Sequence, residues 1–224
     1  MRKAIFGISA VLLFPLLIPA QQNVHPITGR QYAGAMGVQG APWLVRQERE
    51  QEEQPEKALD ELKIAKGSTA ADIGAGVGYM SWRLAERVGP TGKVYANDVQ
   101  PQMLDLLRMN LAERHITNVV PVLGEFDDPK LPQGQIDLVL MVDVYHEFTQ
   151  PQAMLRHIRE SLKADGRVVL LEYRAEDPRV PILPLHKMTV QQVKSELEPE
   201  GFRFQQVIET LPRQHILIFT KKPS

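Results

Sequence analysis

The alternation of apolar and polar stretches along the chain predicts strands and helices in turn. Five short runs rich in apolar residues predict strands, and the third and fourth are continuous, as in parallel strands covered on both faces. Between these runs, apolar residues recur at helical spacing. Strands that alternate with helices predict a parallel sheet with right-handed crossovers. The predicted strands span residues 69–73, 93–97, 119–123, 136–142 and 168–171.

The pattern changes after the fifth strand. A proline-rich link leads to Thr189, which is suited to capping a helix together with Gln192 three residues on. Two further runs, at about 203–211 and 215–220, are joined by only three residues and must therefore pair antiparallel. We predict an α/β fold with a Rossmann-like seven-stranded sheet, in which five parallel strands are followed by a C-terminal antiparallel hairpin and helices cover both faces.

The N-terminus has the pattern of a secretory signal peptide over residues 1–20. A basic start is followed by an apolar run and by Ala20, a small residue suited to a cleavage point. The run is shorter than the ~20 residues of a spanning helix, and Pro15 interrupts it. We therefore expect an exported protein, periplasmic or secreted, without stable membrane contact once the signal is cleaved. A membrane-anchored protein with an uncleaved signal is the alternative.

Residues 21–61 form a predicted N-terminal lid or helical segment ahead of the main domain at 62–224. Up to about residue 41 this segment is polar and glycine-rich, and it is either a lid whose His25, Arg30 and Tyr32 reach the substrate or a linker. Two short helices divided by Pro55 should follow. The charged stretch at 46–53 is most simply a solvated face.

The composition argues against several kinds of binding partner and cofactor. The 224 residues have a formal net charge of −1 with scattered lysines and arginines, so we expect no nucleic-acid partner. The chain contains no cysteine, which excludes disulfides, thiolate metal sites and a cysteine nucleophile. No group of His, Asp or Glu has recognisable metal-ligand spacing, so we expect no metal. The oligomeric state stays open.

The chain is organised around a glycine-rich turn after the first strand. Gly74, Gly76 and Gly78 allow backbone conformations closed to other residues, and the following helix N-terminus offers free N–H groups to a ligand. The spacing differs from the dinucleotide fingerprint, because Tyr79 stands where that fingerprint has its third glycine. The turn therefore favours a nucleotide-sized ligand other than NAD.

The run Asp-x-Gly-x-Gly-x-Gly, from Asp72 to Gly78, resembles motif I of the class I S-adenosylmethionine-dependent methyltransferases, in their small-molecule, type 11 or UbiE-like branch. The resemblance extends from about Leu62 to the C-terminus. It implies S-adenosylmethionine as cofactor, a small-molecule acceptor and methyl transfer by in-line displacement. It also implies cofactor contacts from Asp72, Gly74, Ala75, Gly76, Gly78, Tyr79, Asp98, Val99, Glu125, Phe126 and Asp143.

Acidic residues follow the second and third strands. A carboxylate at Asp98 would accept hydrogen bonds from both ribose hydroxyls of the cofactor, although it would also serve NAD or cap the next helix. Within the resemblance, Glu125 would accept from the adenine amine, with Asp127 in reserve, and Phe126 would lie against the ring. The alternative for this loop is a solvated acidic turn.

The methyl acceptor should lie near residues 142–148, after the fourth strand. His146, with Tyr145 beside it, is our candidate for catalysis, because a histidine with a pKa near neutrality is a natural general base. Packing or substrate binding is the alternative role for His146. Arg174 would anchor an anionic acceptor or pair with Glu172, and His186 in the proline-rich link is a weaker candidate.

Two other functions are compatible with part of this pattern. An NAD(P)-dependent short-chain oxidoreductase should have Tyr-x-x-x-Lys, and no tyrosine of this chain has a lysine four residues later. A cofactor-binding protein without catalysis remains open, because export would take the chain away from the cytoplasm, where the cofactor is made.

Overall fold

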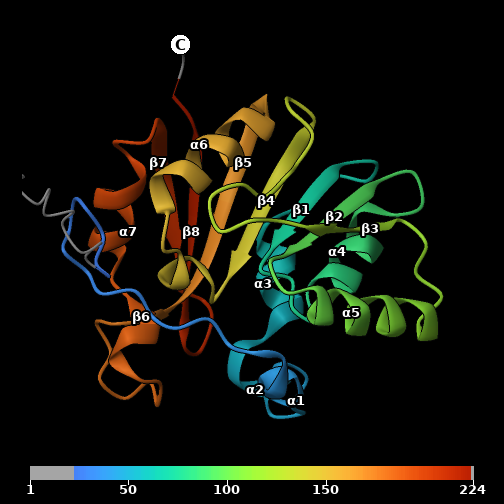
Figure 1. Cartoon of the computed structure of the whole chain (residues 1–224), viewed down its shortest axis with the longest axis horizontal. Coiled ribbons are helices and arrows are strands. Elements are labelled where there is room, and N and C mark those ends of the chain that lie inside the picture. Colours follow the sequence, from blue (N-terminus) through green and yellow to red (C-terminus); the bar gives the residue numbers. More distant parts are fainter. Residues whose placement is uncertain (1–22, 223–224) are drawn as a thin grey trace, which may run out of the picture.

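The computed structural model describes residues 23–222 and contains one mixed sheet of eight strands (Figure 1). Its order is β3-β2-β1-β4-β5-β8-β7, with β1 to β5 parallel and β8 antiparallel to both neighbours. The short β6 pairs with the end of β5. The predicted α/β fold with its C-terminal hairpin is confirmed. The strands are β1 (Thr69–Ile73), β2 (Lys93–Asp98), β3 (Val119–Leu123), β4 (Ile136–Val142), β5 (Leu162–Arg174), β6 (Lys187–Met188), β7 (Phe202–Ile208) and β8 (Gln214–Lys221).

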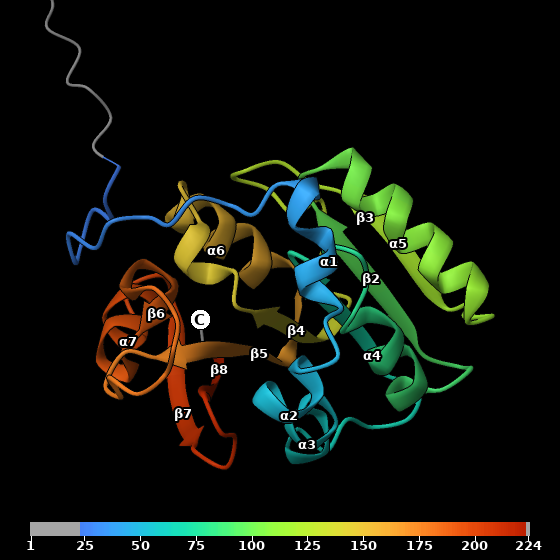
Figure 2. The same cartoon turned by 90° about the horizontal axis from the view of Figure 1, so that it is seen from below.

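Helices cover both faces of the sheet (Figures 1 and 2). One apolar cluster joins α3 and α4 to the sheet, and a neighbouring cluster joins α5 to the same face of β2. Another cluster packs α6 and α7 on the opposite face. The helices are η1 (Val38–Gly40), α1 (Ala41–Leu44), α2 (Arg49–Glu53), α3 (Pro55–Glu61), α4 (Ser81–Val88), α5 (Pro101–Glu113), η2 (Tyr145–Glu147), α6 (Pro151–Ser161), η3 (Pro184–His186) and α7 (Val190–Leu197).

Local sequence signals fix several helix starts. Pro55, Pro101 and Pro151 each occupy the first position of a helix, where the missing N–H costs no intrahelical hydrogen bond. Thr189 forms the predicted capping box with Gln192, because each side chain accepts a hydrogen bond from the other residue's backbone N–H. These signals place the loops that carry the polar residues of the site.

Two expectations about local structure need correction. The fifth strand was expected over 168–171, but β5 already begins at Leu162, and its pairing with β4 jumps from Leu162 to Arg167. The residues between these two, which include Asp165 and Gly166, form an irregularity within the strand. The charged stretch at 46–53 is a solvated face only in part, because Gln47, Glu48, Glu50 and Gln51 are exposed but Arg49 and Glu53 of α2 are buried. They pair with each other, which removes the cost of burying either charge alone.

The N-terminal segment from residue 23 crosses the edge of the sheet at which the parallel strands end (Figure 1). Ala58, Leu59 and Leu62 belong to the core of the sheet domain, so the segment up to residue 61 packs on that domain. The predicted signal peptide at 1–20 lies outside the described residues. Among residues 23–222, no helix has the length and apolar character that crossing a bilayer requires.

Candidate active site

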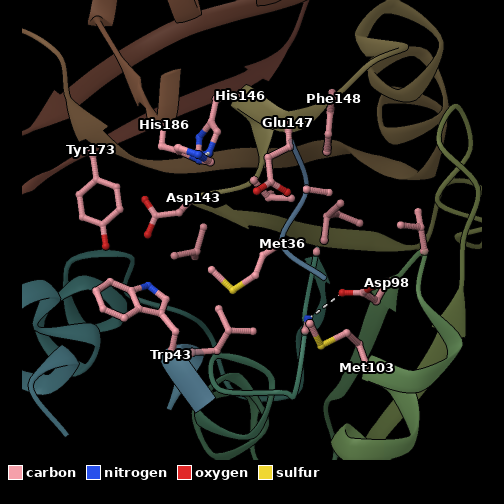
Figure 3. Close-up of a pocket in the computed structure, with 18 of the residues that line it drawn as sticks. Met36, Trp43, Asp98, Met103, Asp143, His146, Glu147, Phe148, Tyr173 and His186 are labelled. Carbon is pink, nitrogen blue, oxygen red and sulfur yellow. Dashed lines mark hydrogen bonds between the residues drawn. The ribbon is translucent and has the colours of Figure 1, made fainter. Parts of the chain in front are cut away.

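A cavity of about 400 Å³ lies at the carboxyl ends of the parallel strands. The strand order reverses there, because β1 pairs with β2 on one side and with β4 on the other. Ligands of open α/β sheets bind at such a reversal. The cavity is lined by the loops after β1, β2 and β4, by the N-terminal segment and by the proline-rich link before β6 (Figure 3).

The loop after β1 is the glycine turn, and it places backbone directly against the cavity. Gly74 and Gly76 line the cavity with left-handed φ angles of 69° and 53°. A Cβ on Gly74 would lie 2.4 Å from Cγ2 of Val144, and one on Gly76 would lie 2.7 Å from Cδ1 of Leu44. The turn therefore requires glycine for its backbone conformation and for close packing.

We expect Gly74→Ala to destabilise the protein by about 1–3 kcal/mol more than Gly134→Ala, because only the first change also overpacks the core. Gly134 has a similar φ of 65°, but a Cβ there meets nothing within 4 Å. It therefore isolates the left-handed backbone strain of roughly 1–2 kcal/mol. Adding Val144→Ala to Gly74→Ala should remove most of the difference. Urea unfolding measures the free energy of unfolding of each variant. An equal loss of stability in Gly74→Ala and Gly134→Ala would contradict the expectation.

Asp98 lies at the end of β2 and faces the cavity from beside the glycine turn (Figure 3). Its Oδ2 accepts a hydrogen bond from the Gly76 N–H at 2.8 Å, and its Oδ1 accepts one from the Gln100 N–H at 2.9 Å. Burial raises the pKa of Asp98, and the backbone hydrogen bonds oppose that rise. Each carboxylate oxygen keeps acceptor capacity for a ligand hydroxyl. Val99, the next residue, also lines the cavity.

Several residues of the predicted cofactor site lie behind the turn instead of lining the cavity. The Asp72 carboxylate accepts a hydrogen bond from the Ser81 hydroxyl at 2.6 Å, and burial raises its pKa to about 7. The Tyr79 hydroxyl donates to Glu50 at 2.7 Å. The cavity lining also lacks Ala75 and Gly78. In this structure these residues therefore shape the turn from outside the cavity lining, and their contact with the cofactor stays a prediction.

The loop after β3 meets the prediction in part. Phe126 lines the cavity with 58% of its surface exposed, so one face of its ring is available to a ligand. Glu125 does not line the cavity, and its exposed carboxylate lies 3.2 Å from the Lys130 ammonium. Its reserve, Asp127, is likewise absent from the lining. The two carboxylates predicted to contact adenine therefore lie outside the cavity lining in this structure.

Asp143 begins the loop after β4 and is held in a buried polar network. Its φ of 51° is unusual for a residue other than glycine, and its Oδ2 accepts a hydrogen bond from the Gln214 side chain at 2.8 Å. Its Oδ1 is buried without a hydrogen-bond partner among residues 23–222. Burial, followed by the nearby Glu53 carboxylate, raises the pKa of Asp143 well above its usual value. The cavity thus contains an acceptor that a cationic ligand group would satisfy.

Glu53 and Arg49 of α2 take part in the same network, although the sequence pattern suggested neither as a site residue. Arg49 Nε donates to Glu53 at 2.6 Å, and the Tyr173 hydroxyl donates to the other Glu53 oxygen at 2.8 Å. All three residues line the cavity. The signal in the sequence was the density of charge just before Pro55, which local pattern alone does not distinguish from a solvated helix.

His146 is buried on the far side of the cavity from Asp98 (Figure 3). Its Nδ1–H donates to Glu172 at 2.6 Å, and the other Glu172 oxygen accepts the Tyr145 backbone N–H at 3.0 Å. On the opposite edge of the ring, Nε2 lies 3.1 Å from Nδ1 of His186. Glu147 lines the cavity beside them. We refer to His146, Glu147, Glu172 and His186 as the histidine end of the cavity.

The pKa values at the histidine end are set by burial and by neighbouring charges. Burial acts to lower the pKa of His146, but the Glu172 carboxylate outweighs it, so the pKa is raised overall. Burial and the His146 charge lower the pKa of His186. Burial raises the pKa of Glu147 to about 7. These ionisable side chains therefore interact strongly where a substrate would enter.

Three expectations about the acceptor site are corrected. The Tyr145 ring packs edge-on against Phe148 in the core and does not line the cavity, so it is not placed for catalysis. Glu172 orients His146 and does not pair with Arg174. Arg174 instead binds Glu209 at 2.7 Å, near the molecular surface.

The N-terminal segment covers the site with residues other than those expected. Arg30 donates to the buried Glu196 of α7 at 2.9 Å, and His25 is buried 3.5 Å from the same carboxylate. Tyr32 is also buried and does not line the cavity. The lining from this segment includes Ala35, Met36, Trp43 and Leu44. The polar residues thus anchor the segment, and its apolar residues face the ligand space.

Comparisons with known proteins agree with this geometry. A family model described as a methyltransferase domain matches residues 64–212. The chain is 29% identical over 116 residues to the ubiquinone/menaquinone biosynthesis C-methyltransferase UbiE of Cupriavidus pinatubonensis. It is 32% identical over 111 residues to the protein-L-isoaspartate O-methyltransferase of Methanococcoides burtonii. These matches cover 51% and 50% of this chain and 47% and 52% of the relatives, so the chain spans about half the length of either one.

A solved structure gives a longer match. The SAM-dependent methyltransferase from Aquifex aeolicus aligns with a TM-score of 0.78 at 25% sequence identity. The alignment covers 83% of this chain and 98% of that protein. The fold is therefore shared over nearly the whole of that structure.

Proposed function

The chain belongs to the methyltransferase-domain family, and from this membership we propose that it transfers a methyl group from S-adenosylmethionine to a small-molecule acceptor. S-adenosylmethionine is the cofactor, and it supplies a methyl group that is already activated on a sulfonium sulfur. The acceptor attacks that methyl in line. The protein contributes by holding the two reactants in position, which removes much of the entropic cost of their encounter.

The observation that carries this proposal is the pairing of Asp98 with the glycine turn. The carboxylate is fixed by the Gly76 and Gln100 N–H groups and faces the cavity. Both oxygens are placed to accept hydrogen bonds from ribose hydroxyls, and Gly74 and Gly76 leave room for the rest of the cofactor. The exposed face of Phe126 is suited to stacking on adenine, without help from Glu125.

The charge of the cavity favours S-adenosylmethionine over NAD. Its lining includes the carboxylates of Asp98, Asp143 and Glu147. The lining arginines, Arg46 and Arg49, are both paired with Glu53. A sulfonium and an ammonium group would stabilise the ionised forms of these carboxyl groups, whose pKa values burial raises, whereas a pyrophosphate would not. We assign the unpartnered Asp143 Oδ1 to the ammonium group of the cofactor.

We place the acceptor at the histidine end, with its nucleophilic atom toward Nε2 of His146. The cavity lining also contains apolar side chains, among them Phe148, Ile182 and Leu183, which suits an acceptor with an apolar body. The two curated relatives are named for methylation at carbon and at oxygen, so relatives of similar identity differ in the acceptor atom. The UbiE-like branch remains our assignment within the family.

Calorimetry with S-adenosylmethionine, its demethylated product and NAD tests the cofactor. We expect binding of the first two and none of NAD, whereas NAD binding alone would support an oxidoreductase. Incubation of cell extracts with the protein and an isotopically labelled methyl donor, followed by mass spectrometry, tests turnover. A protein that binds the cofactor but labels nothing would be a cofactor-binding protein without catalysis.

We also propose export, with Gln21 as the mature N-terminus, from the basic start, the short apolar run and Ala20. N-terminal sequencing of the protein from its native host measures this. Detection of an intact Met1 in a membrane fraction would instead support the anchored form.

A further inference from the structure

The histidine end brings together three side chains that can bind a metal, two of them adjacent in the sequence (His146 and Glu147) and one, His186, from a distant segment. One ligand atom from each of His146, Glu147 and His186 lies within 4.8 Å of the others. His146 and Glu147 come from η2 after β4, and His186 comes from η3 in the proline-rich link. Figure 3 shows the two imidazoles against each other, with the Glu147 carboxylate nearby. We expected no metal from the sequence because we considered only the spacing of ligands along the chain. The fold brings His186 next to His146 and Glu147 from a distant segment.

The spacing of the two imidazoles suits an ion between them. His146 Nε2 and His186 Nδ1 are 3.1 Å apart. Two nitrogens bonded to one zinc ion at ~2.0–2.1 Å lie about 3.3 Å apart at a tetrahedral angle and about 2.9 Å apart at a right angle. The observed distance falls between these values. The distance between the two nitrogens, which form a hydrogen bond here, is therefore also compatible with a shared ion.

The surroundings orient His146 as a metal ligand. Glu172, which is fully buried, accepts the Nδ1–H of His146 at 2.6 Å and is itself fixed by the Tyr145 backbone N–H. Histidines that bind metals nearly always donate their second ring N–H to such a partner, which directs the other nitrogen at the ion. His186 is positioned by the pairing of Tyr173 with Lys187, which ties the link to β5.

We propose that His146, His186 and Glu147 bind one divalent transition-metal ion, and that an open coordination position facing the cavity holds the hydroxyl oxygen of the acceptor. Two imidazoles and one carboxylate favour ions such as Zn²⁺ or Co²⁺ over Mg²⁺ and Ca²⁺, which prefer all-oxygen ligands. The coordination of the acceptor hydroxyl by the ion rests on the proposed function. The binding of the ion by the three side chains does not depend on it.

The ion gives the histidine end a defined task. Coordination lowers the pKa of a hydroxyl as it does that of water, so the acceptor releases its proton to solvent near neutral pH. The oxygen then forms a bond to the methyl carbon as the carbon–sulfur bond breaks. The electron pair of that bond stays on sulfur, and the products are a methyl ether and a neutral thioether. In this arrangement His146 is a ligand and not the general base.

Calorimetric titration of the full chain, first stripped of metal with a chelator, with Zn²⁺ tests the site. We expect one equivalent to bind, with an affinity at least 10-fold weaker in His186→Ala and in Glu147→Gln. Glu172→Gln should weaken binding by roughly 10–100-fold, as loss of an orienting partner does. The matched control is His157→Ala, which removes a partly exposed histidine that also lies beside a carboxylate. Circular dichroism verifies folding, and Co²⁺ absorption reports imidazole coordination.

The outcomes separate the metal site from the proposed function. Absence of Zn²⁺ binding, or binding unchanged in His186→Ala and Glu147→Gln, overturns the inference, and S-adenosylmethionine binding in the same protein would leave the methyltransferase proposal intact. Zn²⁺ binding without cofactor binding would keep the site and contradict the proposed function. Once an acceptor is found, an unchanged rate in metal-free protein would overturn the role of the ion in transfer.

Discussion

Replacing Asp98 by Ala is expected to weaken S-adenosylmethionine binding by roughly 100-fold or more. The carboxylate would supply two charge-assisted hydrogen bonds to the ribose, each contributing about 1.5–3 kcal/mol, and every 1.4 kcal/mol is tenfold in affinity. The same side chain holds the Gly76 and Gln100 N–H groups, so the variant also loosens the glycine turn. Calorimetry with S-adenosylmethionine measures the loss.

Two further variants make this result interpretable. Asp98→Asn keeps one carbonyl oxygen to accept from the backbone and should bind more weakly than the native protein but more tightly than Asp98→Ala. Asp105→Ala removes an exposed aspartate of α5 that pairs with Arg108, outside the cavity lining, and it should leave affinity unchanged. If Asp98→Ala folds and binds the cofactor with native affinity, the ribose lies elsewhere.

Replacing His146 by Ala is expected to lower the rate of methyl transfer by roughly 100-fold or more at saturating cofactor, the scale of a lost general base or of an equivalent contact with the acceptor. Cofactor affinity should barely change, because Asp98 and the glycine turn lie on the other side of the cavity. Turnover with the labelled methyl donor measures the rate, and calorimetry measures the affinity.

The choice of substitution matters because His146 is a hydrogen-bond partner of the buried Glu172 carboxylate. His146→Ala leaves Glu172 without its imidazole partner, and breaking a buried pair of this kind costs about 3–5 kcal/mol. His146→Asn retains an N–H near the position of Nδ1 and removes only Nε2. We therefore expect His146→Asn to be the more stable variant and equally slow.

The His146 result also assigns its role. Loss of acceptor affinity at a native rate would make His146 a binding residue. A variant that keeps both would remove the histidine end from the mechanism. His157→Ala again provides the control, because that histidine lies on α6 outside the cavity lining.

The sequence by itself determined the sheet, the glycine turn and the positions of Asp98 and His146 relative to the strands. Strand and helix periodicity is a local property, and the carboxyl ends of parallel strands always share one edge of the sheet. A residue just after a predicted strand can thus be placed near the site without knowledge of its contacts. The capping box at Thr189 was predictable for the same reason, since its two partners are three residues apart.

Only the tertiary structure decided which way side chains point after the strands end. His146 meets Glu172 and His186, which follow it by 26 and 40 residues, while its neighbour Tyr145 turns into the core. The burial of Glu53 depends equally on Tyr173, 120 residues away. Local sequence does not reveal such pairings, because they form only when the whole sheet packs and brings distant residues together, and each buried charge then needs partners from among them.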